Sequence, residues 1–262
     1  MSKTLIPAQR QEKIQEYLIE HSVASSTELS ELLEVSEATI RRDLDRMAEE
    51  GVLVRTHGGA ILNRHLQLEQ EYKKRAQRNV AEKSEIGRLA SKLIQDGDIV
   101  FINSGTTTTQ LIRQIEPNAN ITVVTNNLSA ALDIADAGPE LILLGGTFQP
   151  KSNSVAGRFS INNLNQIYAN QSFIGVDGIS LTHGYTVPSS AEAEIVKSMI
   201  ERTKGPVTVI ADHSKWEAVS NFEIAKFDRI QRFITDETLG RIAKDILNEH
   251  NIELLVAGIS ST

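Results

Sequence analysis

The chain has 262 residues, of which 40% are hydrophobic and 23% charged, with a formal net charge of −7 and no cysteine. The apolar share is enough for one large core or two modest ones, and the missing cysteines exclude disulfides and thiolate metal centres. No apolar run approaches the roughly 20 residues that span a bilayer, and no signal peptide is recognisable. We therefore expect a cytoplasmic protein that does not contact a membrane.

The N-terminal segment predicts three helices. One is expected from about Ala8 to His21, a second short helix opens at Ser26, and Ser36 is a suitable N-cap for a third helix that Gly51 ends. Apolar residues recur at helical spacing in all three. Those expected to be buried are Ile14, Leu18, Val23, Leu29, Leu32, Leu33, Ile40, Leu44 and Met47.

A hairpin follows the third helix, with strands over 52–56 and 60–62 around a turn at 57–59. Two short helices joined by a tight turn, and then such a hairpin, are the pattern of a winged helix-turn-helix. In this interpretation the recognition helix covers 37–49, and the hairpin is the wing. The residues expected to face DNA are Ser36, Glu37, Thr39, Arg41 and Arg42 on the helix and Arg55 and His57 in the wing.

Other interpretations of this segment stay open. Acidic residues outnumber basic ones up to Arg64, so DNA binding would depend on where Arg41 and Arg42 lie and not on net charge. An ordinary three-helix packing unit, whose two arginines only solvate a face, also fits the spacing. Glu37 could accept a hydrogen bond from a cytosine amino group or simply favour the helix N-terminus.

Residues 63–80 are polar and charged, and we interpret them as a linker between domains over 1–62 and 81–262. From Asp98 onward, β-branched runs alternate with helical patterns. The expected strands are 98–102, 121–125, 141–144, 173–176, 207–211, 229–234 and 252–256, and the expected helices are 107–114, 129–137, 159–168, 191–203 and 239–249. This alternation predicts an α/β domain with a mostly parallel sheet that is covered on both faces.

A loop of glycine and hydroxyl residues joins the first of these strands to its helix. Asn103, Ser104, Gly105, Thr106 and Thr107 would direct backbone N–H groups and the positive helix end toward one point, which suits a phosphate group. No lysine completes a Walker motif and no GxGxxG follows a strand, so a nucleoside triphosphate or dinucleotide is not expected. A purely structural N-cap explains the loop about equally well.

Polar clusters also follow four later strands, at 125–127, 145–147, 177–179 and 212–215. Turn chemistry explains each of them singly. In an open α/β sheet, however, ligands bind outside the carboxyl ends of the strands. Together the clusters therefore predict a ligand site at that edge of the sheet.

The N-terminal segment resembles the signature of the DeoR family of bacterial regulators. The resemblance lies in Val35-Ser36-x-x-Thr39-Ile40-Arg41-Arg42-Asp43-Leu44, followed by Gly51, Arg55 and His57-Gly58-Gly59-Ala60. It implies a winged helix-turn-helix repressor of a carbohydrate-utilisation operon, which binds operator double-stranded DNA as a homo-oligomer. Paired half-sites about one helical turn apart, or multiples of it, would then be expected.

Residues from Ala81 to Val256 resemble the effector domain of the same family, whose fold is similar to ribose-5-phosphate isomerase. The resemblance implies that a phosphorylated sugar releases the protein from its operator. Position by position, it places the phosphate on Ser104, Gly105, Thr106 and Thr107, the sugar on Asn126 and Gly146, and a polar wall on Asp177, Gly178, Glu192, Lys197 and Lys215.

Two other functions stay open. A sugar-phosphate isomerase or deaminase needs a base and a group that stabilises an enediolate. In the isomerases the stretch resembling 176–180 carries a second carboxylate where this chain has Ser180, which favours binding without turnover, although Asp177, Glu192 and Lys215 remain candidates for weak activity. An architectural DNA-binding protein whose second domain only oligomerises is the other alternative. The six histidines show no metal-ligand spacing and no GxSxG motif occurs, so no metal and no cofactor are expected.

Overall fold

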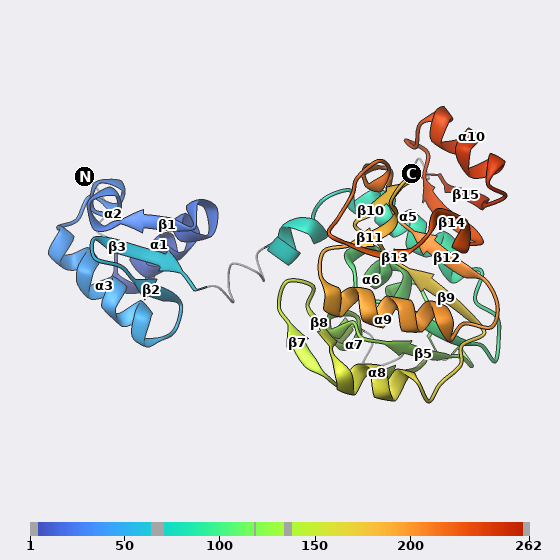
Figure 1. Ribbon diagram of the computed structural model, residues 1–262. Coiled ribbons are helices and arrows are strands. Elements are labelled where there is room, and N and C mark those ends of the chain that lie inside the picture. The colour runs from blue at the N-terminus through green and yellow to red at the C-terminus, as the bar shows by residue number, and fades with distance from the viewer. Residues whose placement is uncertain (1–4, 64–70, 118, 134–137, 259–262) are drawn as a thin grey trace. The chain divides into compact units, whose positions relative to one another are not determined.

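The computed structural model describes residues 5–63, 71–117, 119–133 and 138–258. Backbone contacts divide the chain into two compact units, Met1–Lys73 and Lys74–Thr262, which we call the N-terminal and C-terminal units (Figure 1). The C-terminal unit thus begins within the stretch that the sequence analysis treats as a linker, so residues 74–80 belong to its folded structure.

The N-terminal unit packs three helices against a small antiparallel sheet. Its elements are α1 (Pro7–His21), β1 (Val23–Ser25), α2 (Ser26–Leu33), α3 (Glu37–Glu49), β2 (Leu53–Arg55) and β3 (Gly59–Leu62). The strands pair antiparallel in the order β1-β3-β2. The buried residues that join helices and sheet are Ile14, Leu18, Leu29, Leu33, Ile40, Leu44 and Met47. The predicted winged helix-turn-helix is therefore confirmed.

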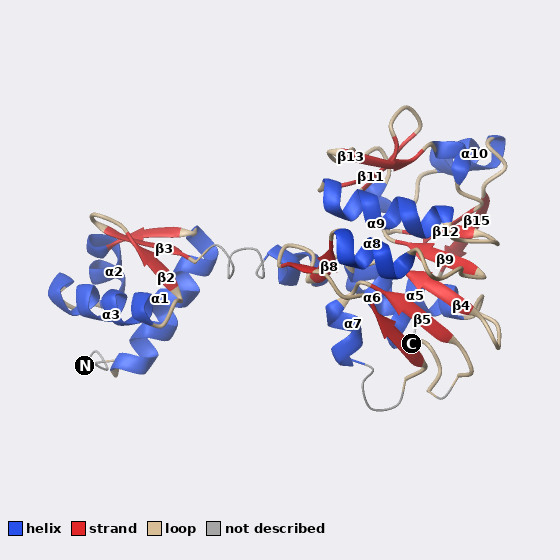
Figure 2. Ribbon diagram, turned by 60° about the horizontal axis from the view of Figure 1, so that its bottom comes forward, coloured by secondary structure: helices blue, strands red, loops and turns tan. Residues whose placement is uncertain are grey.

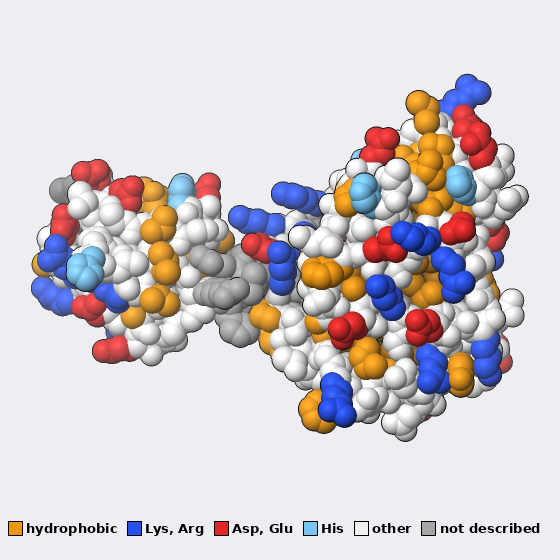
Figure 3. Space-filling model, in the orientation of Figure 1, with side chains coloured by type: hydrophobic (Ala, Val, Ile, Leu, Met, Phe, Trp, Pro, Cys, Tyr) orange, Lys and Arg blue, Asp and Glu red, His pale blue; other side chains and the backbone are white. Residues whose placement is uncertain are grey.

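Two apolar residues that were expected in this core lie outside it. Ser22 adopts a left-handed conformation (φ 66°) that ends α1, so Val23 enters β1 opposite Ile61 and is 56% exposed. Leu32 is 54% exposed, because the buried face of the two-turn helix α2 is formed by Ser26, Leu29 and Leu33. Val23, Ile61 and Val54 form an exposed apolar row across the three strands, and a strip of hydrophobic side chains is visible on this unit in Figure 3.

Local capping explains where the helices of this unit begin and end. The Ser36 hydroxyl accepts a hydrogen bond from the Thr39 N–H group (3.3 Å), as its predicted role as the N-cap of α3 requires. Gly51 follows the helix with φ 74°, a conformation that glycine adopts without strain. At α2 the cap is Ser25, which forms a capping box with Glu28. Each cap contributes about 1 kcal/mol to helix stability.

The C-terminal unit is built on a seven-stranded sheet in which every strand pair is parallel (Figure 2). The strands are β4 (Ile99–Ile102), β5 (Thr122–Thr125), β6 (Glu140–Leu143), β9 (Gln171–Ile174), β12 (Val207–Ile210), β14 (Arg232–Asp236) and β15 (Glu253–Ala257). Each corresponds to one of the strands predicted from the sequence. Their order is β15-β14-β12-β9-β4-β5-β6, so the direction in which strands are added reverses between β4 and β9.

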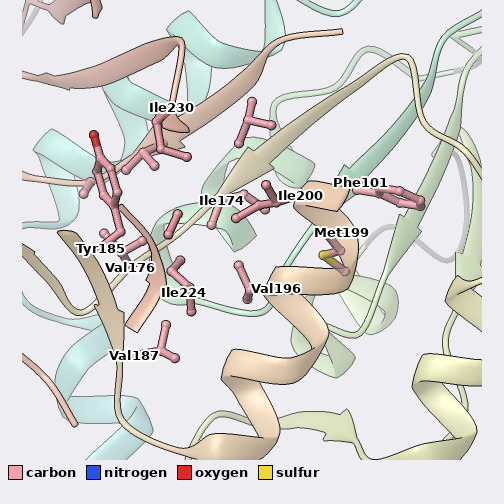
Figure 4. Close-up of a cluster of buried hydrophobic side chains, with 14 of the residues drawn as sticks. Phe101, Ile174, Val176, Tyr185, Val187, Val196, Met199, Ile200, Ile224 and Ile230 are labelled. Atoms are coloured by element: carbon pink, nitrogen blue, oxygen red, sulfur yellow. The ribbon is translucent and has the colours of Figure 1, made fainter. Parts of the chain in front are cut away.

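Helices cover both faces of this sheet. They are α5 (Val80–Ser91), α6 (Thr106–Arg113) and α7 (Leu128–Asp133) on one face and α8 (Arg158–Leu164), α9 (Ser190–Glu201) and α10 (Arg241–Glu249) on the other. Val100 and Ile102 of β4 pack with the first group, whereas Phe101 between them packs in the cluster that contains Met199 of α9 (Figure 4). This alternation along a buried strand produces the three-layer α/β architecture. None of the helices in the described ranges is long and apolar enough to span a membrane.

Short antiparallel elements that the sequence analysis did not predict are added to this framework. They are a hairpin of β7 (Thr147–Gln149) and β8 (Ser154–Ala156) and a sheet of β10 (Gly178–Ser180), β11 (Gly184–Val187) and β13 (Phe222–Ala225), with single turns of 3-10 helix at His213–Lys215 and Phe227–Arg229. These strands are three or four residues long and lack the continuous apolar runs that identify the main-sheet strands. The small sheet follows β9 and β12, whose carboxyl ends border the site described next, and Ser152 in the turn of the hairpin also lines that site.

Candidate functional site

The start of α3 exposes the side chains that were expected to face DNA. Arg41 and Arg42 are both exposed, and the hydroxyl oxygens of Ser36 and Thr39 lie 2.9 Å apart at the same end of the helix. Arg42 forms no ion pair or hydrogen bond with the residues that the structure describes, so its charge is free to meet an external anion.

Glu37 is held from two sides. The Thr27 hydroxyl donates to one of its carboxylate oxygens (2.9 Å), and the Arg41 guanidinium donates to the other (3.0 Å). In the free protein this carboxylate therefore ties α2 to α3 and partly neutralises Arg41. Both contacts are exposed and could be exchanged for contacts with DNA at low cost.

The wing uses its arginine internally. The Arg55 guanidinium donates to the Gly59 carbonyl (2.8 Å) and pairs with Asp45 of α3 (2.9 Å), which fastens the hairpin to the recognition helix. A Cβ atom on Gly59 would lie 2.0 Å from the Ala24 carbonyl oxygen, so only glycine allows β3 to approach β1 there. His57 is exposed at the turn. Two wing residues were expected to face phosphate. Arg55 forms contacts within the protein, whereas the His57 side chain forms no hydrogen bond with the residues that the structure describes.

A second site lies in the C-terminal unit. A cavity of about 460 Å³ is found at the carboxyl ends of β4 and β9, where the strand order reverses. Open α/β sheets bind ligands at such switch points. The residues predicted from the sequence that line this cavity are Asn103, Ser104, Gly105, Thr106, Thr107, Asn126, Asp177, Glu192 and Lys215.

Helix α6 begins on the wall of the cavity. No side chain caps this helix, and within the described residues no hydrogen bond uses the N–H groups of Gly105, Thr106 or Thr107. The Thr108 and Thr109 hydroxyls donate to the Gly105 carbonyl (3.0 and 2.7 Å) and fix the first turn. Unused N–H groups at the positive end of a helix form an anion-binding site.

The two asparagines of the site are occupied with the loop itself. The Asn103 amide accepts from the Gly175 N–H group (2.7 Å) and donates to the Gly175 carbonyl (2.9 Å), which joins the ends of β4 and β9. The Asn126 amide accepts from the Ser104 N–H group (2.8 Å) and donates to the Val155 carbonyl (3.0 Å). Both side chains therefore shape the strand ends and the loop before α6, and their amide groups already have hydrogen-bond partners within the protein.

Charged side chains of both signs surround this loop. The cations are Arg75, Arg78, Lys83 and Lys215, and the carboxylates are Asp177, Glu192 and Asp212. Asp177 Oδ1 lies 3.6 Å from Arg75 Nη1 and 3.8 Å from Lys215 Nζ, so two cations share one partly buried carboxylate oxygen. Burial raises the pKa of Glu192, although a hydrogen bond with Ser152 opposes the shift. The cavity thus combines a helix start whose N–H groups are unused with carboxylates that can accept hydrogen bonds from hydroxyl groups.

Asp212 at the end of β12 organises the opposite wall. Burial works against its ionisation, but hydrogen bonds from Ser214 and Asn79, together with the charge of Lys83, outweigh burial and lower the pKa of this carboxyl. Lys83 is only 4% exposed, and burial lowers the pKa of its ammonium group although Asp212 opposes the shift. The opposite charges of Lys83 and Asp212, both of which line the cavity, therefore stabilise one another.

His213 is oriented by a buried carboxylate. Its Nδ1 lies 2.9 Å from Asp236 Oδ1, and its backbone N–H group donates to Asp236 Oδ2 (2.8 Å). Asp236 is 1% exposed, whereas the His213 ring lines the cavity. The second ring nitrogen is therefore available to a ligand. In the described ranges no group of three or more His, Cys, Asp or Glu side chains could hold a metal ion.

Three residues predicted for the effector site do not line the cavity. A Cβ atom on Gly146 would lie 2.2 Å from Ser160 Oγ, and one on Gly178 would lie 2.4 Å from the Ala218 carbonyl oxygen, so both glycines serve close backbone packing. Lys197 is exposed on α9. The helix presents Glu192 and Val196 to the cavity, and the next residue is turned about 100° away from that face.

Several lining residues were missed by the sequence analysis. They are Arg75, Arg78, Asn79, Lys83 and Ser152, whereas Asp212, His213 and Ser214 belong to the polar cluster 212–215 that was expected at this edge of the sheet. One signal could have revealed Lys83, since it lies three, four and seven positions before the buried Ile86, Gly87 and Ala90 and thus on the buried face of α5. A lysine on such a face needs a buried partner.

Comparisons with known proteins match both units of the chain. The model of the DeoR-like helix-turn-helix domain matches residues 10–65, and that of the DeoR C terminal sensor domain matches residues 78–237. The HTH-type transcriptional repressor GlcR of Bacillus subtilis (strain 168) is 34% identical over 244 residues, which cover 93% of each protein. The HTH-type transcriptional regulator IolR of the same organism is 32% identical over 253 residues, which cover 95% of this chain and 98% of that protein.

Among solved structures, ribose 5-phosphate isomerase A from Methanocaldococcus jannaschii matches with a TM-score of 0.38 and 16% identity, over 51% of this chain and 53% of that one. A score this low supports no conclusion, so the fold assignment depends on the observed sheet and the family matches. Both family models and full-length relatives agree on one assignment. The chain belongs to the DeoR family of HTH-type transcriptional regulators, with a helix-turn-helix domain followed by a C-terminal sensor domain.

Proposed function

We propose that this regulator represses a carbohydrate-utilisation operon and is released from its operator by a phosphorylated sugar bound in the cavity of the C-terminal unit. The observation that carries the proposal is the uncapped start of α6, whose free N–H groups lie on a cavity wall together with Arg75 and Lys215. A dianionic phosphate group matches this arrangement. The carboxylates Asp177 and Glu192 would accept hydrogen bonds from sugar hydroxyls.

At the operator, Ser36, Thr39, Arg41 and Arg42 would contact base edges and phosphates from the start of α3. Arg55 would act indirectly, because its contacts with Asp45 and Gly59 set the angle of the wing on the recognition helix. His57 at the tip of the wing would reach the backbone. The protein would bind as a homo-oligomer to paired half-sites, as expected for helix-turn-helix regulators.

A thermal-shift screen against matched pairs of sugars and sugar phosphates tests the proposal. A ligand at 100 times its dissociation constant stabilises the folded state by about 2.7 kcal/mol, which raises the unfolding midpoint measurably. Only the phosphorylated member of a pair is expected to do so. Plain sugars that shift the midpoint equally would contradict the phosphate assignment.

Two lysines provide matched variants for this screen. Lys215 lines the cavity beside Asp177, whereas Lys197 is exposed on α9 and does not line it. Lys215→Ala is expected to reduce the shift caused by a phosphorylated sugar, and Lys197→Ala to leave it unchanged. Equal effects of the two variants would mean that the ligand binds elsewhere.

A sugar-phosphate isomerase is the second candidate, and one observation favours it. Asp177, Glu192 and Asp212 surround the cavity, so carboxylates that could move a proton are present. Ser180, where the isomerases carry an acid, lies outside the cavity, with its hydroxyl beside Thr182 and His183. We propose binding without turnover. A coupled assay that detects conversion of an aldose phosphate at ordinary enzymatic rates would overturn this.

A further inference from the structure

One wall of the cavity is formed by the chain that leads to the N-terminal unit. Residues 74–79, here called the junction segment, directly follow the boundary between the units. Arg75 and Arg78 of this segment, with Lys83 of α5, are three of the four lysine and arginine side chains that line the cavity, and Lys215 is the fourth. Most of the positive charge that would attract an anionic ligand therefore lies close to the boundary.

The backbone of the junction segment is anchored at two points. Lys83 Nζ donates to the carbonyl oxygens of Arg75 (2.7 Å) and Arg78 (2.6 Å), and so caps the end of a helix that runs over residues 71–76. Asn79, in a left-handed conformation (φ 50°), donates to Asp212 Oδ1 (2.8 Å). Lys83 and Asp212 are 4% and 1% exposed, so water competes little for these contacts. The segment is thus fixed to the base of the cavity.

The contacts of Arg75 and Lys215 with Asp177 are looser, although the Arg75 guanidinium also donates a hydrogen bond to the Lys151 carbonyl. The separation of 3.6 Å between Arg75 Nη1 and Asp177 Oδ1 exceeds hydrogen-bond range, as does the 3.8 Å from Lys215 Nζ to the same oxygen. Both cations border the cavity into which the free N–H groups of α6 open. A phosphate group bound there has several acceptor oxygens and can form shorter, charge-assisted bonds with both cations than Asp177 does.

We propose that the junction segment is the part of the sensor that responds to the ligand. An anionic ligand at the start of α6 replaces Asp177 as the partner of Arg75 and thereby changes how firmly helix 71–76 is held in place. This helix extends across the boundary toward the N-terminal unit, so a change in its order reaches the chain that carries the DNA-binding domain. The inference rests on the proposed function, because it requires an anion in the cavity. It assigns binding alone to Lys215, and both binding and transmission to Arg75.

Hydrogen exchange of the full-length protein, followed by mass spectrometry, tests this assignment with inorganic phosphate as the probe. A thermal shift recorded in parallel reports occupancy. Phosphate is expected to change the exchange rates of the amides of residues 71–76, including 71–74, which do not line the cavity. Because these amides cannot touch the ligand, their response reports transmission and not contact.

Three arginine and lysine variants separate the two roles. Arg75→Ala and Lys215→Ala should each weaken phosphate binding about tenfold, the effect of losing one charge-assisted hydrogen bond. At phosphate concentrations that restore occupancy, Lys215→Ala should regain the response at 71–76 and Arg75→Ala should not. Arg88→Ala is the control, since Arg88 is a partly exposed residue of α5 that pairs with Glu85 and does not line this cavity. Arg75→Gln serves the same comparison if the alanine variant does not fold.

The possible failures are distinguishable. If wild-type protein binds phosphate and residues 71–76 do not respond, or if the Arg75 variant responds fully at restored occupancy, the junction segment is only a wall and the inference is overturned while the proposed function stands. If neither inorganic phosphate nor any phosphorylated sugar shifts the midpoint, the proposed function and this inference fail together.

Discussion

Under the proposed function, the neighbouring residues Arg41 and Arg42 at the start of α3 would lose different internal contacts on binding DNA. Arg41 is paired with Glu37 at 3.0 Å in an exposed contact, which contributes about 0.3–0.5 kcal/mol. Arg42 has no such partner among the described residues. A phosphate contact made by Arg42 therefore costs no internal ion pair, whereas Arg41 must first exchange Glu37 for DNA.

We expect both Arg41→Ala and Arg42→Ala to weaken operator binding, and Arg42→Ala to weaken it more. If each arginine neutralises one phosphate, each variant should lower the slope of log affinity against log salt by about 0.9. Fluorescence anisotropy with the promoter region of the regulated operon, at several salt concentrations, measures both quantities. Arg46→Ala is the control, because Arg46 is exposed in the last turn of α3 and pairs with Glu50. Unchanged affinity in both test variants would rule out this helix as the recognition helix.

Glu192 has a partly buried carboxyl group whose charge state affects stability. Since burial raises the pKa of Glu192 in the folded protein, the unfolded chain releases this proton at lower pH than the folded chain does. As the pH rises from the ordinary glutamate range to the raised pKa, the unfolded state binds fewer protons, and the free energy of unfolding falls. Below that window both states are protonated and the penalty is absent.

Glu192→Gln removes this titration. The variant should unfold at a higher temperature than the wild type above the window, and the difference should shrink as the pH falls below the usual pKa of glutamate. Unfolding midpoints across the acidic and neutral range provide the measurement. Glu194→Gln, at an exposed position of the same helix, is the matched control. A gap between Glu192→Gln and wild type that does not vary with pH would show that packing, and not ionisation, causes it.

Among the elements, α1 and α3 are joined by a buried ion pair. The Arg10 guanidinium binds the carboxylate of Asp43 through two nitrogens and also donates to the Leu5 carbonyl (3.2 Å). Arg10 and Asp43 are 7% and 6% exposed, and the hydrogen bonds with Asp43 raise the pKa of Arg10. The position of α3 relative to α1 therefore depends on an ion pair, and removing either partner would leave the other charge buried and unpaired at a high cost in free energy.

Arg10→Ala should destabilise the N-terminal unit by about 3–5 kcal/mol, because it leaves a buried carboxylate unpaired. The only tryptophan, Trp216, lies in the C-terminal unit. In a denaturation experiment, far-UV circular dichroism should therefore show an additional transition at lower denaturant, as the N-terminal unit unfolds. The midpoint measured by Trp216 fluorescence should not change. The double variant Arg10→Met with Asp43→Leu should recover most of the loss, since it buries no charge. Equal shifts of both probes would instead mean that the two units unfold together.

For the whole molecule, regulation requires that the two sites influence one another. If a sugar phosphate weakens operator binding by some factor, the operator must weaken binding of that sugar phosphate by the same factor. Titration calorimetry of the ligand, with and without saturating operator DNA, should therefore reproduce the ratio obtained from operator titrations with and without ligand. Unequal ratios would indicate a further species, such as a change in oligomeric state, in one of the two experiments.

Much of this fold could be predicted because its signals are local. The stripe Ile40, Leu44 and Met47, the Ser36 cap and Gly51 define α3 within a short stretch of chain, and the three residues of the stripe are buried as expected. The apolar runs of the main sheet are equally local, which is why its strands were all recognised. The loop over 104–107 was recognised as an anion-binding loop candidate for the same reason, since its glycine and hydroxyl residues lie between one strand and one helix.

Only the tertiary structure decided which of these pieces meet. The sequence does not encode the order of parallel strands in any short pattern, and it is this order that brings Asp212 and Lys215 of the β12 end beside the α6 loop. Arg75 lines the cavity although it lies in the stretch that was interpreted as a linker. Gly146 and Gly178 were expected in the site but do not line the cavity, because each lies where two backbone segments approach closely. The sequence by itself determined the N-terminal elements, the strands of the main sheet and the family, since periodicity, caps and motifs act over a few residues. The composition of the cavity was decided by contacts between segments far apart in the chain, which only packing specifies.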